Sequence, residues 1–377
     1  MAIYDVIVLG VGAMGSAACH QLAQRGARVL GLEQFSLVHD RGSSHGQTRI
    51  IRQAYFEHPD YVPLLFRTYE LWNDLEQRSG SRLFHQVGLV LSGVPGGETI
   101  SGATLSAHQH HLQIEKLRPD EAARRWPVFM FPQDHTILFE PKAGYLKVED
   151  CVRAQVHQAL KYGATIYENE PALGWSSNGQ AVTVRTDRNE YHASSLVITA
   201  GAWAARCLNS LSLPLRVLRK FVGWFPVRSG DFSLQKMPTH FYELPHGTFY
   251  GFPSLDGRSA KLAEHSGGQD VQDPATVDRE KHPNDITRLA DFVKGHLPGL
   301  DPAPQDHSVC LYTMTPDQHF VLDRHPAWSN VSIAAGFSGH GFKFAPVIGE
   351  ALADLALNGS TKHPIGFLSL NRFSENK

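Results

Sequence analysis

The sequence lacks several features that mark specialised protein classes. Among its 377 residues there are only four cysteines, Cys19, Cys151, Cys207 and Cys310, and no two of them form a C-x-x-C pair. This scarcity argues against a zinc site or a disulfide framework and favours a reducing cytoplasm. No apolar run reaches the roughly eighteen residues of a membrane span, so we expect no membrane insertion.

The sequence also lacks a strong charge of either sign. A formal net charge of -2 gives no electrostatic reason to bind nucleic acid or an anionic membrane. The 21 histidines form no H-E-x-x-H motif or tight cluster, so we expect no metal site. With 42% hydrophobic and 19% charged residues, the composition is typical of a globular enzyme, and the length suits two domains.

A nucleotide-binding pattern lies near the front of the chain. An apolar run at residues 4–9 leads into Gly10, Gly12 and Gly15, which have the spacing G-x-G-x-x-G, and a helical segment over residues 13–25 follows. In a βαβ unit the first glycine makes a tight turn, the second admits a pyrophosphate and the third lets the helix pack on the strand. The pattern therefore predicts a dinucleotide site.

The acidic residue and the later blocks narrow the choice of dinucleotide. A second apolar run, residues 29–32, ends in Glu33, which can accept hydrogen bonds from ribose hydroxyls. This motif alone does not separate FAD from NAD. Two further buried strands, in residues 196–203 and 330–336, each run into a glycine, although an ordinary core strand with a glycine turn has the same pattern. Three such blocks suit the long FAD molecule better than a nicotinamide nucleotide.

These blocks predict an α/β and α+β fold in which a Rossmann-like FAD-binding domain is interleaved with a substrate domain rich in β-sheet. We expect the FAD-binding domain to comprise residues 1–84, 148–216 and 322–377. The substrate domain then comprises residues 85–147 and 217–321. Within its first segment, apolar spacing predicts a helix over residues 105–112.

A polar loop, residues 39–52, follows the first nucleotide-binding block. It holds three arginines and two histidines in fourteen residues. A solvated surface loop would explain this composition. However, the loop begins six residues after Glu33, so we expect it to stay close to the cofactor.

Four longer segments carry a resemblance to a known family. They are GSSHGQTRIIRQAY at residues 42–55, FYGFPS at 249–254, CLYTMTPDQHF at 310–320 and AAGFSGHGFKFAP at 334–346. On these segments, and over nearly its full length, the chain resembles the monomeric sarcosine oxidase family, which includes N-methyltryptophan oxidase.

The resemblance implies a covalently bound FAD. Cys310 matches the cysteine that forms a thioether with the 8α-methyl carbon of the flavin, whereas an isolated cysteine would ordinarily be a small buried hydrophobe. His45 and Arg49 match residues that lie against the flavin ring, where a cation stabilises developing negative charge. Arg52 and Lys343 match the two cations that hold the substrate carboxylate, and two cations together would invite an anion.

Four further positions match the family's catalytic and substrate-binding residues. Lys261 matches the lysine credited with activating oxygen, although its neighbours alone would suggest a surface lysine. Tyr250 and His265 match residues that line the substrate pocket, and His340 matches a residue beside the flavin or the substrate. The sequence departs from the family in having Phe241 where a smaller or more flexible side chain is expected, so the pocket shape differs.

The full set implied to bind the cofactor combines the glycine motif, the polar loop and the later blocks. It consists of Gly10, Gly12, Ala13, Met14, Gly15, Glu33, Gln34, Arg41, Ser43, His45, Thr48, Arg49, Ile50, Ala200, Gly201, Cys310, Met314, Phe337, Gly339, His340, Gly341 and Lys343.

The resemblance implies a cytoplasmic, monomeric flavoprotein oxidase. It would use oxygen to demethylate sarcosine or a similar N-methyl amino acid, giving formaldehyde, glycine and hydrogen peroxide. Three alternatives stay open. They are oxidation of N-methyltryptophan or of a cyclic imino acid such as pipecolate or proline, an FAD amine dehydrogenase with another electron acceptor, and a non-catalytic flavin-binding or NAD-dependent protein.

Overall fold

The computed structural model describes residues 4–373. Within it, the nucleotide-binding pattern forms the centre of the first sheet. Strand β1 (Tyr4–Leu9) pairs in parallel with β2 (Val29–Leu32), and helix α1 (Ala13–Gln24) connects them. Residues Val6–Leu9 of β1 and all four residues of β2 are buried, as expected for strands covered on both faces.

The first sheet has eight strands that come from distant parts of the chain. Beside β2 lies β9 (Thr165–Tyr167), and on the other side of β1 lies β12 (Glu190–Ile198), which in turn pairs with β20 (Trp328–Ala335). The sheet is completed by β19 (Val321–His325) and by the antiparallel strands β10 (Ala172–Ser177) and β11 (Val182–Thr186). Strands of the N-terminal, middle and C-terminal blocks thus share one sheet.

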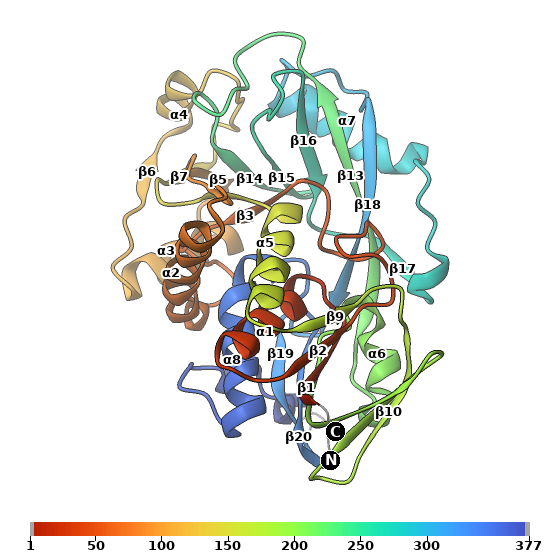
Figure 1. The fold of residues 1–377 in the computed structure, drawn as a ribbon. Helices are drawn as coiled ribbons and strands as arrows, with labels where there is room; N and C mark the ends of the chain where they lie inside the picture. Colours follow the sequence, from red (N-terminus) through yellow and green to blue (C-terminus); the bar gives the residue numbers. More distant parts are fainter. Residues whose placement is uncertain (1–3, 374–377) are drawn as a thin grey trace.

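Helices cover one face of this sheet and bury its largest hydrophobic cluster. Helix α1 packs against α5 (Val148–Lys161) and α8 (Ala345–Asn358), and α2 (Val62–Ser79) packs on α8. A short helix, α6 (Ala204–Cys207), follows β12. Figure 1 shows α1, α8 and α6 in the lower half of the molecule and α2 and α5 near its middle.

A second sheet of nine strands forms the upper part of the molecule (Figure 1). Its strands are β5 (Leu89–Gly93), β6 (Glu115–Leu117), β7 (Thr136–Glu140), β13 (Arg216–Pro226), β14 (Thr239–Leu244), β15 (Gly247–Gly251), β16 (Ser259–Glu264), β17 (Gln269–Val271) and β18 (Asp306–Met314). Helices α4 (Pro119–Arg125) and α7 (Pro283–His296) contribute to the hydrophobic cluster on one of its faces.

A small third sheet joins the polar loop to the rest of the molecule. Strand β8 (Gly144–Lys147) pairs with β3 (Thr48–Ile51) and with β4 (Phe84–His85). Because β3 lies in the polar loop, this pairing fixes the loop between the two large sheets. The end of the loop is therefore part of a sheet, whereas Asp40, Arg41, Ser43 and Gln47 before it are exposed.

The predicted fold class is confirmed, but one helix boundary is wrong. Helix α3 spans Glu98–Gln109 and not residues 105–112. Its first turn is held by Glu243, whose carboxylate accepts hydrogen bonds from the backbone N–H groups of Glu98 (3.0 Å) and Thr99 (2.8 Å). This cap comes from β14, so no local pattern could have revealed it. The division into two domains at the stated boundaries stays a prediction.

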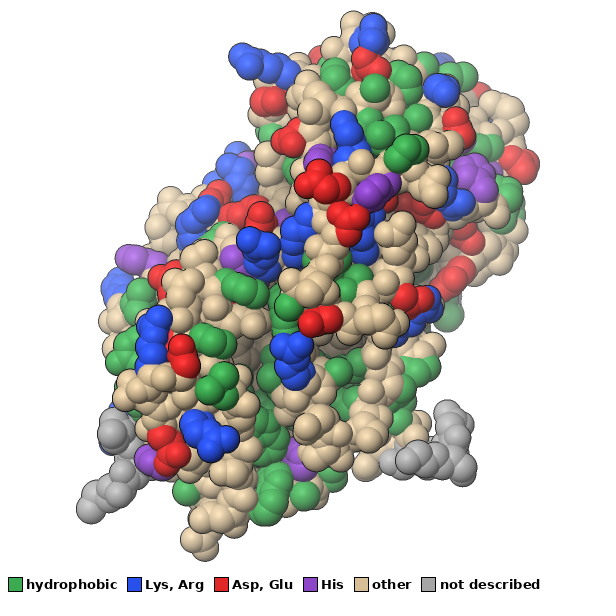
Figure 2. Space-filling view, turned by 90° about the vertical axis from the view of Figure 1, so that its right-hand side faces the viewer, with side chains coloured by type: hydrophobic (Ala, Val, Ile, Leu, Met, Phe, Trp, Pro, Cys, Tyr) green, Lys and Arg blue, Asp and Glu red, His purple; other side chains and the backbone are tan. Residues whose placement is uncertain are grey.

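The surface carries charges of both signs, and the described residues contain no helix fit to span a membrane and no cluster fit to hold a metal ion. On the face in Figure 2, Lys and Arg side chains are interspersed with Asp and Glu side chains. No helix within residues 4–373 is long and apolar enough to cross a membrane. In the same residues, no group of three or more His, Cys, Asp or Glu side chains is arranged to hold a metal ion.

Candidate active site

The glycine turn after β1 has the tight geometry that its spacing predicts. Gly10 has a φ of +85°, and a Cβ at this position would lie 2.8 Å from the carbonyl oxygen of Thr199. A Cβ at Gly15 would lie 1.8 Å from the carbonyl oxygen of Gly10. At Gly12 the nearest heavy atom would be Ser44 Oγ at 3.4 Å. Gly10 and Gly15 are thus required for packing, whereas Gly12 leaves space in front of helix α1.

Glu33 follows the last residue of β2 and contacts the glycine turn that follows β1. Its buried carboxylate accepts hydrogen bonds from the backbone N–H groups of Val11 (2.8 Å) and Phe35 (3.1 Å), and His39 Nε2 lies 3.4 Å from it. These contacts fix the carboxylate at the edge of the large cavity described next. His39 was not predicted, although it lies within the polar loop.

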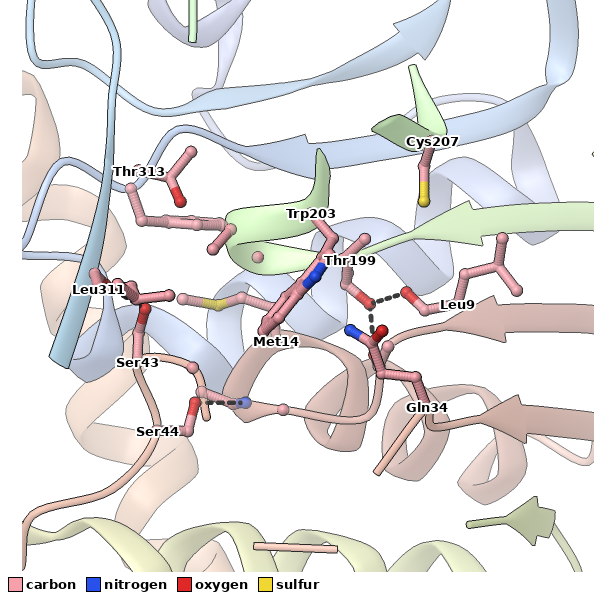
Figure 3. A pocket seen from close by; sticks show the side chains of 18 of the residues that line it. Leu9, Met14, Gln34, Ser43, Ser44, Thr199, Trp203, Cys207, Leu311 and Thr313 are labelled. Carbon is pink, nitrogen blue, oxygen red and sulfur yellow. Dashed lines mark hydrogen bonds between the residues drawn. The ribbon is translucent and has the colours of Figure 1, made fainter. Parts of the chain in front are cut away.

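A cavity of about 450 Å³ extends from the glycine turn to the second sheet. Figure 3 shows Ser44 Oγ accepting a hydrogen bond from the backbone N–H of Ala13 (3.1 Å). Beside the same turn the Thr199 hydroxyl donates to the carbonyl oxygens of Leu9 (3.0 Å) and Gly10 (2.7 Å). The lining combines the N-terminal motif, the end of β12, β18 and the glycine-rich segment after β20.

The structure brings most predicted cofactor residues to this cavity. Those that line it are Gly10, Gly12, Ala13, Met14, Glu33, Gln34, Ser43, Arg49, Ala200, Gly201, Cys310, Phe337, Gly339 and Gly341. Lining residues that the sequence did not single out include Ser44, Thr199, Trp203, Cys207 and Leu311.

Other predicted cofactor residues lie elsewhere. Ile50, His340 and Lys343 line a second, smaller pocket, Thr48 lines a third cavity and Met314 a fourth. Gly15, Arg41 and His45 do not line these cavities. Gly15 contributes by letting α1 approach β1, and the other two lie in the polar loop without reaching the cavity surface.

Arg49 and Cys310 meet at the end of the large cavity beside the second sheet. Cys310 is buried in the middle of β18, and Arg49 Nη2 donates a hydrogen bond to its Sγ (3.3 Å). The guanidinium is held in place by the carbonyl oxygens of Ser43 (2.8 Å) and Thr48 (2.9 Å). A fixed cation and a thiol therefore face the same end of the cavity.

His45 does not supply a second cation there. It is buried, with Nε2 3.1 Å from the Gly42 carbonyl oxygen and Nδ1 3.2 Å from Ser308 Oγ. Burial and the nearby Arg49 guanidinium lower the pKa of His45 to about 4. The imidazole is thus neutral at pH 7, and the positive charge beside this end of the cavity comes from Arg49.

A small pocket of about 60 Å³ adjoins the large cavity. Arg49 and Gly339 line both. All five predicted substrate-binding residues line the small pocket, namely Arg52, Tyr250, His265, His340 and Lys343. They come from the segment after β3, from β15, from the end of β16 and from the segment before α8, so only the fold brings them together.

Arg52 already has an anionic partner that the sequence did not reveal. Its Nη2 lies 2.6 and 2.7 Å from the two carboxylate oxygens of Glu57, and its guanidinium packs on the rings of Tyr55 and Phe56. Burial would raise the pKa of Glu57, but Arg52, His340 and Lys343 together lower that pKa to about 2. Glu57 is therefore ionised and forms a buried ion pair with Arg52.

Lys343 is the second buried cation of the small pocket. Its Nζ donates to the His340 carbonyl oxygen (2.6 Å) and to Tyr55 Oη (3.4 Å). Burial and then the neighbouring Arg52 lower the pKa of Lys343 to about 7, against the opposing effect of Glu57. The pKa of Lys343 thus lies far below that of an ordinary lysine and close to neutral pH.

Aromatic rings and neutral histidines form the remaining walls of the small pocket. Phe241 packs on Phe56 and on His265, with ring centroids 5.2 and 5.8 Å apart. Burial and the charge of Lys220 lower the pKa of His265 to about 3, and burial lowers that of His340 to about 4. Both imidazoles are neutral at pH 7, so the charged side chains that line the small pocket are those of Arg49, Arg52, Lys343 and Glu57.

Lys261 lines neither the large cavity nor the small pocket. It is buried behind the turn at residues 46–48 and lines a separate cavity of about 160 Å³. Its Nζ donates to the carbonyl oxygens of Gly46 (2.6 Å) and Thr48 (2.7 Å) and to Thr48 Oγ1 (3.0 Å). Burial and the Arg49 charge hold the pKa of Lys261 well below its usual value.

The residues around the large cavity fit a flavin dinucleotide. The open surface at Gly12, the Glu33 carboxylate and the N-terminus of α1 are suited to a pyrophosphate and a ribose. Cys310 and Arg49 at the other end are suited to a reactive ring. The fold and this cavity together define an oxidoreductase that binds a dinucleotide cofactor.

Comparison with known proteins supports an oxidoreductase that binds a dinucleotide cofactor. Residues 5–355 match the family described as FAD dependent oxidoreductase, and the chain belongs to this family. It is 44% identical over 377 residues to a monomeric sarcosine oxidase of Streptomyces avermitilis, with 98% of each chain covered. It is 34% identical over 372 residues to an N-methyl-L-tryptophan oxidase of Yersinia pestis, with 98% of this chain and 99% of that protein covered. The predicted resemblance is thus confirmed.

A solved structure shows a closely similar fold. The open form of NikD, an unusual amino acid oxidase essential for nikkomycin biosynthesis, superposes with a TM-score of 0.87 at 27% sequence identity, covering 98% of both chains. The predicted cofactor, FAD, follows from membership of the family.

Proposed function

We propose that the protein is a flavoprotein oxidase that demethylates sarcosine or a similarly small N-methyl amino acid. Sarcosine, oxygen and water would give glycine, formaldehyde and hydrogen peroxide. The observation that carries this proposal is the small pocket, which has Arg52 and Lys343 in its lining, aromatic walls, and a junction with the cofactor cavity where Arg49 lines both. Its volume of about 60 Å³ is that of roughly four to six water positions, which suits a small amino acid.

Arg52 and Lys343 would bind the substrate carboxylate. The guanidinium fork can grip two carboxylate oxygens, and the ammonium adds a second positive charge. Because Arg52 is paired with Glu57, the substrate carboxylate must displace Glu57 from at least part of the fork. Glu57 thus acts as an internal anion that balances the two cations until substrate arrives.

The aromatic walls favour a neutral substrate amine. Phe241 and Tyr250 exclude water around the position next to the cofactor cavity, and desolvation lowers the pKa of an amine. The amine can then give up its proton on entry, which leaves the nitrogen lone pair available for oxidation. FAD, when bound, supplies the chemistry by taking two electrons from the substrate and passing them to oxygen.

Cys310 and the glycine turn would hold the cofactor at its two ends. We propose a thioether between Cys310 and the flavin 8α-methyl carbon, supported by the position of Cys310 in the cavity wall and by its contact with Arg49. Arg49 would stabilise negative charge on the reduced ring. Lys261 would assist the oxygen reaction through its fixed positive charge. We further propose a monomer of the cytoplasm, in keeping with four unpaired cysteines.

A peroxide-coupled assay over N-methyl amino acids and cyclic imino acids tests this proposal. We expect sarcosine to give the highest kcat/KM and to yield one formaldehyde for each hydrogen peroxide. Protein precipitated in acid should keep its yellow colour, and the Cys310→Ser variant should lose it. Absence of peroxide with every substrate, together with reduction of an artificial electron acceptor, would instead identify a dehydrogenase.

One observation favours a second candidate, an oxidase for a bulkier substrate such as N-methyltryptophan. A cavity of about 390 Å³ lies next to the small pocket and shares Phe56, Glu57, Phe241 and His265 with it. A large side chain could extend into this cavity while its carboxylate reached Arg52. The peroxide-coupled assay distinguishes the two candidates, because an oxidase for bulky substrates should have a higher kcat/KM for N-methyltryptophan than for sarcosine.

A further inference from the structure

The turn at residues 46–48 has a strained backbone. Gln47 has a φ of +69°, and the Thr48 N–H donates to the Gly46 carbonyl oxygen (2.8 Å). A γ-turn with a positive φ at a non-glycine residue is rare, and such strain persists only where surrounding contacts hold it.

Glu149 provides contacts of this kind. Its Oε1 accepts hydrogen bonds from the N–H groups of Gly46 (2.7 Å) and Gln47 (3.1 Å), and its Oε2 lies 3.2 Å from the Gln47 nitrogen. The Val148 N–H also donates to the Gln47 carbonyl oxygen (2.9 Å). The start of helix α5 therefore holds one side of the turn.

Lys261 occupies the other side of the same turn. An ammonium has three N–H donors, and the three hydrogen bonds to Gly46 and Thr48 use all of them. The peptide group between Gly46 and Gln47 donates its N–H to Glu149 and accepts from Lys261 at its carbonyl. One peptide thus connects a carboxylate to a buried ammonium, and each charge polarises it in the same sense.

We propose that Glu149 is a positioning residue for Lys261, because its carboxylate holds the turn whose oxygens bind the ammonium. This inference rests on the proposed role of Lys261 in the oxygen reaction. The inference adds Glu149, a residue of helix α5, to the groups that support the oxygen reaction. Glu149 lines neither the cofactor cavity nor the substrate pocket.

The charges around Lys261 support this assignment. Burial and the Arg49 charge lower the pKa of Lys261, whereas the Glu149 charge acts in the opposite direction. Two more carboxylates, Asp256 and Asp306, line the cavity that Lys261 shares. Removal of the Glu149 charge should therefore lower the pKa of Lys261 further.

The first test measures how firmly the turn at residues 46–48 is held, by hydrogen–deuterium exchange. Glu149→Gln keeps an acceptor oxygen but removes the charge, and Glu149→Ala removes both. The matched control is Asp150→Asn, the next residue of α5, whose carboxylate pairs with Arg153 (3.1 Å). Hydrogen–deuterium exchange of residues 44–50 should become at least about tenfold faster in Glu149→Ala and stay unchanged in Asp150→Asn. Unchanged exchange in Glu149→Ala would overturn the positioning role.

The second test separates the two half-reactions by stopped flow on the holoenzyme. In Glu149→Gln, reoxidation by oxygen should slow by about tenfold, while anaerobic reduction by sarcosine changes less than about twofold. The decline of the reoxidation rate at alkaline pH should also begin at a lower pH. In a Lys261→Met background the Glu149→Gln change should add almost nothing, because the two residues act as one unit.

The outcomes distinguish this inference from the proposed function. Slow reoxidation in Lys261→Met with normal reoxidation in Glu149→Gln would overturn the inference alone. An equal effect of Glu149→Gln with and without Lys261 would also overturn it. Normal reoxidation in Lys261→Met would overturn the role of Lys261, and the inference with it.

Discussion

The nucleotide end and the substrate end of the cavity system are built on different physical principles. Around Gly10 and Gly12 the surface is mostly main chain, with a helix N-terminus and one carboxylate, Glu33. Around Arg52 and Lys343 it consists of buried charged side chains whose balance depends on Glu57. The nucleotide end should therefore be sensitive to added atoms, and the substrate end to changes of charge.

The largest effect is expected from an added methyl group at the nucleotide end. In Gly15→Ala the new Cβ would lie 1.8 Å from the Gly10 carbonyl oxygen. The carbonyl oxygen belongs to the backbone and the new Cβ is bonded directly to it, so neither atom can move aside, and we expect a loss of about 3 kcal/mol in the free energy of unfolding. Urea unfolding in a Cys310→Ser background, from which the flavin can be removed, measures this loss. The control is Gly12→Ala, whose Cβ meets only Ser44 Oγ at 3.4 Å. It should unfold normally yet bind FAD poorly, and equal destabilisation would contradict this distinction.

The next effect concerns charge at the substrate end. Arg52→Ala should weaken binding of a simple carboxylate inhibitor by about 100-fold, because the bidentate partner is lost. It should also destabilise the fold, since Glu57 is left buried without its partner. The double variant Arg52→Ala/Glu57→Ala should regain stability but not affinity. Unchanged inhibitor affinity in Arg52→Ala would mean that another residue holds the carboxylate.

A smaller effect is a dependence on pH confined to the substrate end. The pKa of Lys343 is lowered from its ordinary value to about 7, so the residue is charged below pH 7 and neutral above it. Affinity for propionate should thus be highest below pH 7 and fall by about tenfold between pH 7 and 9. Titration at several pH values checks this expectation. Lys343→Met should abolish the dependence, and its persistence would assign the titration to another group.

The smallest effect concerns the shape of the small pocket. Phe241→Met replaces a rigid ring, which packs on Phe56 and His265, with a flexible chain. We expect the ratio of kcat/KM for N-ethylglycine to that for sarcosine to rise about threefold to tenfold. Competition between the two substrates measures the ratio. An unchanged ratio would show that Phe241 does not limit the pocket.

The difference between the nucleotide end and the substrate end also explains which parts of the site the sequence could predict. The nucleotide end is encoded locally, in one strand, three glycines and a helix, so spacing and burial pattern predicted β1, α1, β2 and Glu33. The start of α3 depends on Glu243, which lies 145 positions from Glu98, and local periodicity placed it wrongly.

The substrate end could not be assembled from local patterns. Its residues were expected from resemblance to a family, and the fold brings Arg52, Tyr250, His265 and Lys343 to one pocket. Glu57 was missed although it lies five residues after Arg52, because a glutamate in a loop ordinarily faces solvent. Two cations in one buried pocket were the available signal, since they require an anion.

The most direct test of the proposed oxidase is anaerobic mixing of the yellow protein with sarcosine, followed by admission of air. We predict complete bleaching of the flavin absorbance without oxygen. Colour should then return in air, with one hydrogen peroxide and one formaldehyde formed for each sarcosine consumed. Flavin that stays oxidised in the presence of sarcosine and of every other small N-methyl amino acid would contradict the account.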